Sequence, residues 1–252
     1  GLESDMQGPA STAIATSVAL RLLRRLGATA RQPMVVGALD WLGETLDRDL
    51  GVWWIVGPDV NDAPRAPWWH WSADAIGSDS LAGAQRGFVW NPSAELLGQL
   101  YAYREKAPAG VIEIVEARLR AEIAALQVIE SAYDLKCAVR LAETPEAPAD
   151  LVEALDPLIH RSLAAQDPAD EHGPALDYAA GPNSRYADAV APRVDAAIAA
   201  LLSQQDDDGG WKLFWEWGFV DAAAWAKAKR DARGWVTREA LETLRAWGRI
   251  ES

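Results

Sequence analysis

Apolar residues that recur every four positions are the feature of this sequence that most restricts its fold. The first such series consists of Ile14, Val18, Leu22 and Leu26, and the second of Val35, Leu39, Leu42 and Leu46. This period places each series on one face of a helix, which a neighbouring helix must cover. Gly27 is suited to end the first helix and Pro33 to begin the second. The sequence therefore predicts an antiparallel helical hairpin over residues 11–46.

Further helices are predicted along the rest of the chain. One restarts at Asn91-Pro92, another covers residues 131–142, and a longer one between them carries the series Ile112, Val115, Leu119, Ile123 and Leu126. Prolines between residues 148 and 192 should divide the next region into shorter pieces, and Asp221 and Thr237 resemble the caps of two final helices. No segment shows the alternation of β-branched residues that is typical of strands. We therefore expect an all-α fold in a single domain, residues 1–252, with residues 1–10 as a flexible N-terminal segment.

Charge and composition exclude several classes of partner. The formal net charge is −13 and the pI is about 4.7, whereas phosphate backbones and anionic lipids attract clusters of Lys and Arg. We therefore expect no nucleic acid partner. No apolar run approaches the length of a membrane span, and the acidic first five residues are unlike a signal peptide.

The motifs of metal and nucleotide sites are also missing from the sequence. Cys137 is the single cysteine, which excludes an internal disulfide and fits a reducing compartment, so we expect a cytoplasmic protein. His70, His160 and His172 lack the spacing of metal ligands, and there is no phosphate-binding loop or nucleophile elbow. We expect neither a metal nor a cofactor.

Two segments share a layout in which a helix end carrying Leu runs into a polar turn and then Gly, any residue and Trp. The first contains Trp41-Leu42 and Gly51-Val52-Trp53, and the second contains Leu201-Leu202 and the run from Gln204 to Trp211. Repeated helical hairpins bury their apolar faces against one another, as in solenoids and toroids. The repeat therefore favours stacked hairpins.

Gln205, Gly209 and Trp211 stand as Q-x-x-x-G-x-W, which resembles the QW repeat of squalene-hopene and oxidosqualene cyclases and of the related prenyltransferase β-subunits. The resemblance implies an α/α toroid, in which inner and outer helices surround a central apolar cavity. It also implies that the Gln and Trp tie one helix end to the next turn. The D-x-D-D acid motif of the cyclases is missing, and Cys137 has no matching Asp and His for the prenyltransferase zinc site.

The segment from Asp59 to Trp71 carries the richest combination of chemical groups. We predict Asp59, Asp62 and His70 as acid and base groups, because adjacent indoles exclude water and shift pKa values. The predicted substrate-binding residues of this region are Trp53, Asn61, Trp68, Trp69 and Trp71. The alternative is that the prolines and tryptophans only plug one end of the fold.

An aromatic cluster follows each of the two repeats, and the second cluster comes after the second repeat. Here we predict Glu216 as a catalytic carboxylate and Trp211, Trp215 and Trp217 as binding residues. Equivalent turns of a toroid emerge at the same end, so both clusters should face one cavity. A short extended plug is the alternative.

Polar residues on helices complete the candidate site. Glu95 lies in the first turn of a predicted helix, where an apolar pocket would keep it protonated, although favourable placement at a helix N-terminus also explains it. Tyr133 is a candidate binding residue beside Glu130 and Asp134. These two carboxylates share one helical face, where they either act as a pair or are solvated.

Together these features predict an acid-catalysed cyclase or isomerase that acts on a small isoprenoid-like hydrophobic substrate. Aromatic faces would stabilise cationic intermediates, and one of the carboxylates or His70 would move the proton. The alternative is a non-catalytic protein that binds a hydrophobic or sugar-like ligand, or a protein partner, through its tryptophans.

Overall fold

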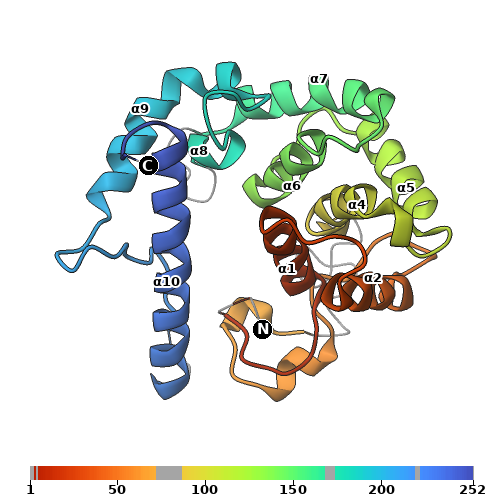
Figure 1. Ribbon diagram of the computed structural model, residues 1–252, viewed down its shortest axis with the longest axis horizontal. Helices are drawn as coiled ribbons and strands as arrows, with labels where there is room; N and C mark the ends of the chain where they lie inside the picture. The colour runs from red at the N-terminus through yellow and green to blue at the C-terminus, as the bar shows by residue number, and fades with distance from the viewer. Residues whose placement is uncertain (1–2, 4, 72–86, 168–173, 219–221, 252) are drawn as a thin grey trace.

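The computed structural model describes residues 3, 5–71, 87–167, 174–218 and 222–251, and over these ranges it consists of helices and loops without strands (Figure 1). The all-α prediction is confirmed. The helices follow one another as α1 (Ala13–Arg25), α2 (Pro33–Thr45), α3 (Gly87–Trp90), α4 (Ser93–Ala102), α5 (Val111–Ala125), α6 (Ala132–Ala142), α7 (Ala149–Ala165), α8 (Ala175–Tyr178), α9 (Ala187–Ser203) and α10 (Ala222–Ala246). Among the described helices, none is both long and apolar enough to cross a membrane.

The helices pack as two series joined by hairpins. In the first series α1 contacts α4, α4 contacts α6, and α6 contacts α8; in the second, α5 contacts α7 and α7 contacts α9. The hairpin pairs α4–α5, α6–α7 and α8–α9 connect the two series. The helices accordingly follow a curve through the molecule (Figure 1). Beside many alanines and valines, the core contains many leucines from the helices, such as Leu39, Leu97, Leu119, Leu135 and Leu155.

Local signals place the ends of the predicted helices correctly. Thr12 caps α1 by accepting a hydrogen bond from the backbone N–H of Ala15 at 3.2 Å, and Ser131 caps α6 through the N–H of Asp134. Gly27 follows α1 with a φ of 74°, a conformation that glycine adopts without strain. The hairpin α1–α2 thus forms where the sequence predicts it, and the predicted series of α2 is buried.

The predicted buried face of α1 is wrong. The helix buries Ala13, Thr16, Ser17 and Leu20, whereas Leu26 of the predicted series is 74% exposed. Small side chains on the buried face allow α1 to pack closely against its neighbours.

The prediction that prolines divide the region 148–192 is confirmed at Pro148, which precedes α7, and at Pro182, which lies between α8 and α9, but it is wrong at Pro157 and Pro192. Pro168 lies outside the described residues. Helix α7 continues through Pro157 and α9 continues through Pro192. A proline inside a helix removes one backbone donor and clashes with the preceding turn, but α7 buries Leu151, Leu155, Leu158, Ile159 and Leu163 on one face. Burial of that face outweighs the local cost.

Thr237 is not a helix cap. It lies inside α10, which is a single helix rather than two, and its hydroxyl accepts a hydrogen bond from the backbone N–H of Trp211 at 3.0 Å. Asp221, the other predicted cap, lies outside the described residues.

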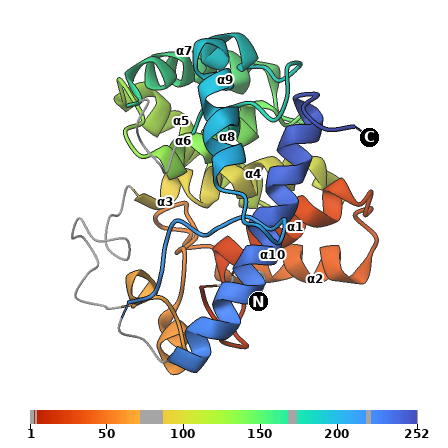
Figure 2. The same ribbon diagram turned by 90° about the vertical axis from the view of Figure 1, so that its left-hand side faces the viewer.

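Helix α10 and the start of the chain lie against each other (Figure 2). The side chain of Gln7 donates to the carbonyl of Ala224 at 2.6 Å, and Arg25 at the end of α1 binds Glu239 and Glu242. Residues 1–10 were expected to be flexible, but the structure buries Asp5 and Met6. The first and last parts of the described chain are therefore packed together.

Candidate functional site

Trp53 and Trp211 make the same hydrogen bonds in the two repeats. The indole N–H of Trp53 donates to the carbonyl of Leu42, and that of Trp211 donates to the carbonyl of Leu201, both at 2.8 Å. Both repeats also contain a glycine with positive φ, 69° at Gly51 and 84° at Gly209. Both indoles are buried, so the observed role of these two tryptophans is to tie a helix end to the next turn.

The two aromatic clusters meet at the N-terminal segment. The Asp5 carboxylate accepts hydrogen bonds from the indole N–H groups of Trp215, at 3.1 Å, and Trp217, at 2.8 Å. On the other side, the carbonyl of Asp5 accepts from the N–H of Ala66 at 2.9 Å, and the N–H of Gln7 donates to Pro64. Residues 5–7 therefore join the segment 64–66 to the segment 215–217.

Asp5 and Glu3 form a pair of carboxyl groups in this junction. Asp5 is only 7% exposed, and burial raises its pKa although the two indole donors lower it. Burial also raises the pKa of Glu3 to about 7, against the lowering effect of the Asp5 backbone N–H, which donates to Glu3 at 3.2 Å. A carboxyl group with this pKa exchanges protons near neutral pH.

The loop 59–71 is ordered by its own polar contacts. Asn61 binds the backbone of Trp71 twice, as donor at 2.7 Å and as acceptor at 3.0 Å. Arg65 lies 2.7 Å from Nδ1 of His70, and both line an open hollow of about 380 Å³. Asp59, Asp62 and His70 are exposed. Asn61 thus positions the loop, while the three predicted catalytic groups face outward.

Aromatic side chains of both segments reach the surface. Trp68 is 38% exposed and Phe214 is 54% exposed, while Trp69 is buried and Trp71 and Trp215 are half-buried. Glu216 is exposed between Trp215 and the buried Trp217. We call residues 64–71 and 214–217 the aromatic surface.

Glu95 lies in an environment opposite to that of a general acid. It is 3% exposed, and its two carboxylate oxygens bind Arg21 of α1 at 2.5 Å and Arg140 of α6 at 2.7 Å. Burial alone would raise its pKa, but attraction to Arg140 and Arg21 outweighs burial and lowers the pKa to about 2. The thiol of Cys137 lies 3.8 Å from Glu95, and burial raises the pKa of that thiol. Glu95 therefore joins three helices as a permanent anion.

Tyr133 and Asp134 differ in their surroundings although they are adjacent. Tyr133 is exposed, and the ammonium group of Lys136 lies 4.9 Å from the centre of its ring. Asp134 is half-buried, and burial raises its pKa to about 7, opposed by the backbone N–H of Asn91 and assisted by Glu122. Neither residue belongs to the junction of the aromatic clusters.

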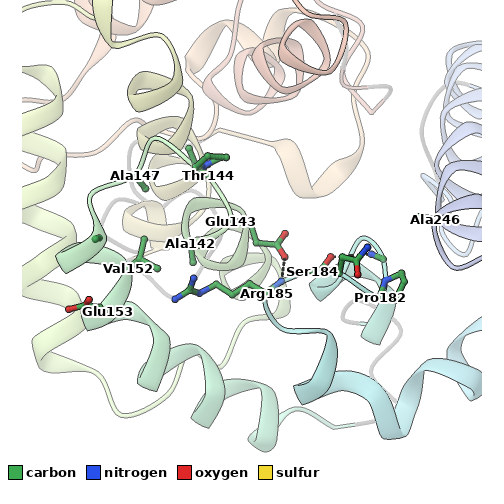
Figure 3. A pocket seen from close by; sticks show the side chains of 14 residues that line it. Ala142, Glu143, Thr144, Ala147, Val152, Glu153, Pro182, Ser184, Arg185 and Ala246 are labelled. Carbon is green, nitrogen blue, oxygen red and sulfur yellow. Dashed lines mark hydrogen bonds between the residues drawn. The ribbon is translucent and has the colours of Figure 1, made fainter.

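A second and larger hollow, of about 890 Å³, lies between the α6–α7 turn, the turn before α9 and the end of α10 (Figure 3). It is lined by Ala142, Glu143, Thr144, Pro145, Ala147, Ala149, Val152, Glu153, Gly181, Pro182, Asn183, Ser184, Arg185 and Ala246. None of the predicted site residues lines it. We call it the α6–α7 groove.

Comparison with known proteins gives no relative: no family model, no curated protein and no solved structure matches this chain. Among the described side chains, no group of three His, Cys, Asp or Glu could hold a metal ion. Interpretation of the site therefore depends on its own geometry.

Sequence reasoning missed Glu3, Asp5 and the α6–α7 groove. Asp5 is separated from Trp215 and Trp217 by more than 200 residues, so no local pattern connects them. A weak signal in the sequence is Met6, an apolar residue in a mostly polar segment. In the structure its side chain is buried.

Proposed function

We propose that this protein binds a sugar-like ligand on the aromatic surface. The observation that carries the proposal is the Asp5 junction, which brings Trp215 and Trp217 together with the loop that bears Trp68. The hydrogen bonds to Asp5 hold Trp215 and Trp217, and the exposed rings of Phe214 and Trp68 lie on the same two segments. Preorganised aromatic groups are typical of binding sites.

The groups around the exposed rings favour a ligand with an apolar face and polar edges. The faces of Trp68 and Phe214 can pack against the C–H face of a sugar ring, and Asp62, His70 and Glu216 are exposed on the same segments. Carboxylates accept hydrogen bonds from hydroxyl groups. An isoprenoid alcohol offers a single hydroxyl group to such residues and would gain most from an enclosed cavity, whereas the hollow beside His70 is open.

Acid catalysis on an isoprenoid-like substrate is a second proposal, and Glu3 is the observation that favours it. Glu3 has a pKa of about 7 and accepts the backbone N–H of Asp5, whose carboxylate binds the indoles of Trp215 and Trp217. A proton donor close to aromatic groups is what such chemistry requires. Under this proposal Glu3 takes the role that the sequence suggested for Glu95.

The arrangement of the hairpins supports an α/α toroid as the finer description of the fold. The series α1–α4–α6–α8 would form the inner layer and α5–α7–α9 the outer layer. The contacts of Arg25 with Glu239 and Glu242, and of Gln7 with Ala224, would close the ring through α10. The cytoplasm is our proposed location, because Cys137 is a buried free thiol.

The experiment is a titration of tryptophan fluorescence with mono- and oligosaccharides and, in parallel, with farnesol. We expect a saccharide to change the emission, and Trp68→Ala to weaken binding about fivefold to tenfold, the value of one aromatic contact. The matched control is Trp235→Ala, which removes a half-buried tryptophan that packs on Arg238 of α10.

Three outcomes separate the proposals. The proposal of a binding protein is supported when the wild type binds a saccharide, Trp68→Ala weakens that binding and Trp235→Ala leaves it unchanged. No response to any saccharide, or equal losses in both variants, overturns it. Conversion of the isoprenoid that is lost in Glu3→Gln would establish acid catalysis instead.

A further inference from the structure

The α6–α7 groove has the size and shape of a ligand site. Its volume of about 890 Å³ lies within the range of small-molecule sites, roughly 300–1,000 Å³. One wall carries Ala142, Glu143 and Val152, and the other carries the turn from Gly181 to Arg185 and the end of α10 at Ala246. The turn approaches α10 closely, since a Cβ on Gly181 would lie 3.5 Å from the Cβ of Ala246. The groove is therefore formed by three separate parts of the chain.

Negative charge predominates in the groove. Glu143 and Glu153 are the acidic residues among its lining residues, and Arg185 is the basic one. The guanidinium group of Arg185 is already bound to Asp156, with Nε 2.9 Å from Oδ1 and Nη2 on the other oxygen. Figure 3 shows the Arg185 side chain running away from the Glu143 carboxylate, to which only its backbone N–H donates. Burial raises the pKa of Glu143 and attraction to Arg185 opposes this rise, but the hydrogen bonds of the guanidinium group go to Asp156. With two glutamates and one arginine, the charged lining residues keep an excess of negative charge.

Glu143 is held at the centre of the lining. Its carboxylate accepts the backbone N–H of Arg185 at 3.1 Å, and burial raises its pKa, opposed by that N–H and by Ser184. A partly desolvated carboxylate gains more from a nearby cation than a fully hydrated one does. Glu153 is exposed at the start of α7, where it would meet a cation at the edge of the groove.

The remaining lining combines apolar side chains, which suit an alkyl chain, with the polar side chains of Thr144, Asn183 and Ser184. Alanine, valine and proline side chains supply most of it, among them Ala147, Val152 and Pro182. An alkyl chain packs against such a surface while its charged end meets a carboxylate.

We propose that the α6–α7 groove binds a linear alkylammonium ion, whose positive charge is attracted by Glu143 and Glu153. Two sources share this chemistry: a free polyamine and the lysine side chain of a peptide. The site is independent of the aromatic surface, because the two have no residue in common.

Calorimetric titration with spermidine and with a short lysine-containing peptide tests the proposal. We expect the double variant Glu143→Gln, Glu153→Gln to bind the amine about tenfold more weakly, as expected for the loss of two partly exposed ion pairs. Glutamine retains the acceptor for the Arg185 N–H, so circular dichroism and thermal unfolding should match those of the wild type.

The matched control is Glu146→Gln. Glu146 lies in the same α6–α7 turn and does not line the groove, and it pairs with Arg24 at 2.7 Å. This control is needed because a protein of net charge −13 attracts cations everywhere. Equal affinity of all three proteins, or no binding of either amine to the wild type, overturns the proposal.

The peptide arm identifies the source of the amine. Tighter binding of the lysine peptide than of spermidine, abolished when the lysine is acetylated, indicates a peptide ligand. The opposite order indicates a free polyamine.

Discussion

Replacement of Glu95 by Gln should destabilise the protein strongly. The variant removes the anion that joins Arg21 of α1 and Arg140 of α6 and leaves two guanidinium groups beside each other in a largely buried position. The fall of the Glu95 pKa from 4.5 to about 2 corresponds to about 3 kcal/mol of folding free energy. Removal of one partner from a buried ion pair costs about 3–5 kcal/mol. We therefore expect a loss of about 3 kcal/mol in the free energy of unfolding.

The dependence on pH distinguishes this charge effect from a packing effect. Because the pKa of Glu95 is lower in the folded state than in the unfolded state, its stabilisation is complete above about pH 4.5 and disappears as the pH falls toward about 2. The difference between the wild type and Glu95→Gln should shrink over the same interval.

Urea unfolding, followed by tryptophan fluorescence and circular dichroism, measures both effects. Glu146→Gln again serves as the control, because its ion pair with Arg24 is exposed and contributes at most about 1 kcal/mol. A loss in Glu95→Gln no larger than that of the control, or a loss that is constant with pH, would refute the reasoning.

Three further predictions concern stability. Trp211→Phe should cost about 1 kcal/mol in urea unfolding, because the Leu201 carbonyl loses the indole N–H of Trp211 and keeps the backbone N–H of Gln204; an unchanged midpoint would contradict this role. Gly51→Ala should lower the melting temperature more than Gly27→Ala. Both glycines have positive φ, but only at Gly51 would an added Cβ lie 2.9 Å from a neighbouring Cβ. Equal shifts in melting temperature would show that this close approach is unimportant. Asp134→Asn should stabilise the protein increasingly as the pH rises from about 4 to about 7. Burial raises the pKa of this carboxyl to about 7, so its charged form opposes folding. A stability difference that does not vary with pH would rule this out.

The helices that the sequence predicted well are those whose signals are local. Helices α1, α2 and α6 begin at a capping residue or a proline, and α2 and α6 bury apolar residues at regular spacing. In α1 the signal at the helix start was right but the predicted buried face was wrong. Each of these signals acts within a few residues, so sequence reading captures them. The repeat was recognised for the same reason, because its glycine and tryptophan lie within one turn.

Prediction failed where distant packing decides the outcome. Prolines inside α7 and α9 are tolerated because the helices are covered by their neighbours, which no local propensity reveals. Thr237 has the residue type of a cap, but its partner is Trp211, 26 residues earlier in the chain.

The candidate site shows the same division. The sequence correctly singled out two aromatic segments, because an excess of tryptophan is visible in composition. That Asp5 links them, and that Glu95 is an ion-paired anion, depends on contacts between residues far apart in the chain. Such contacts decide whether a carboxyl group keeps or loses its proton.

The junction at Asp5 also determines when folding can finish during synthesis. The hydrogen bonds of Asp5 and Gln7 link residues that are 210 to 217 positions apart. Such long-range contacts form late, because a large loop must close first. On the ribosome, residues 5–7 therefore cannot complete their contacts until Trp215 and Ala224 have emerged. A nascent chain that stalls before Trp215 would leave the Asp5 carboxylate exposed to water and this segment open to protease attack.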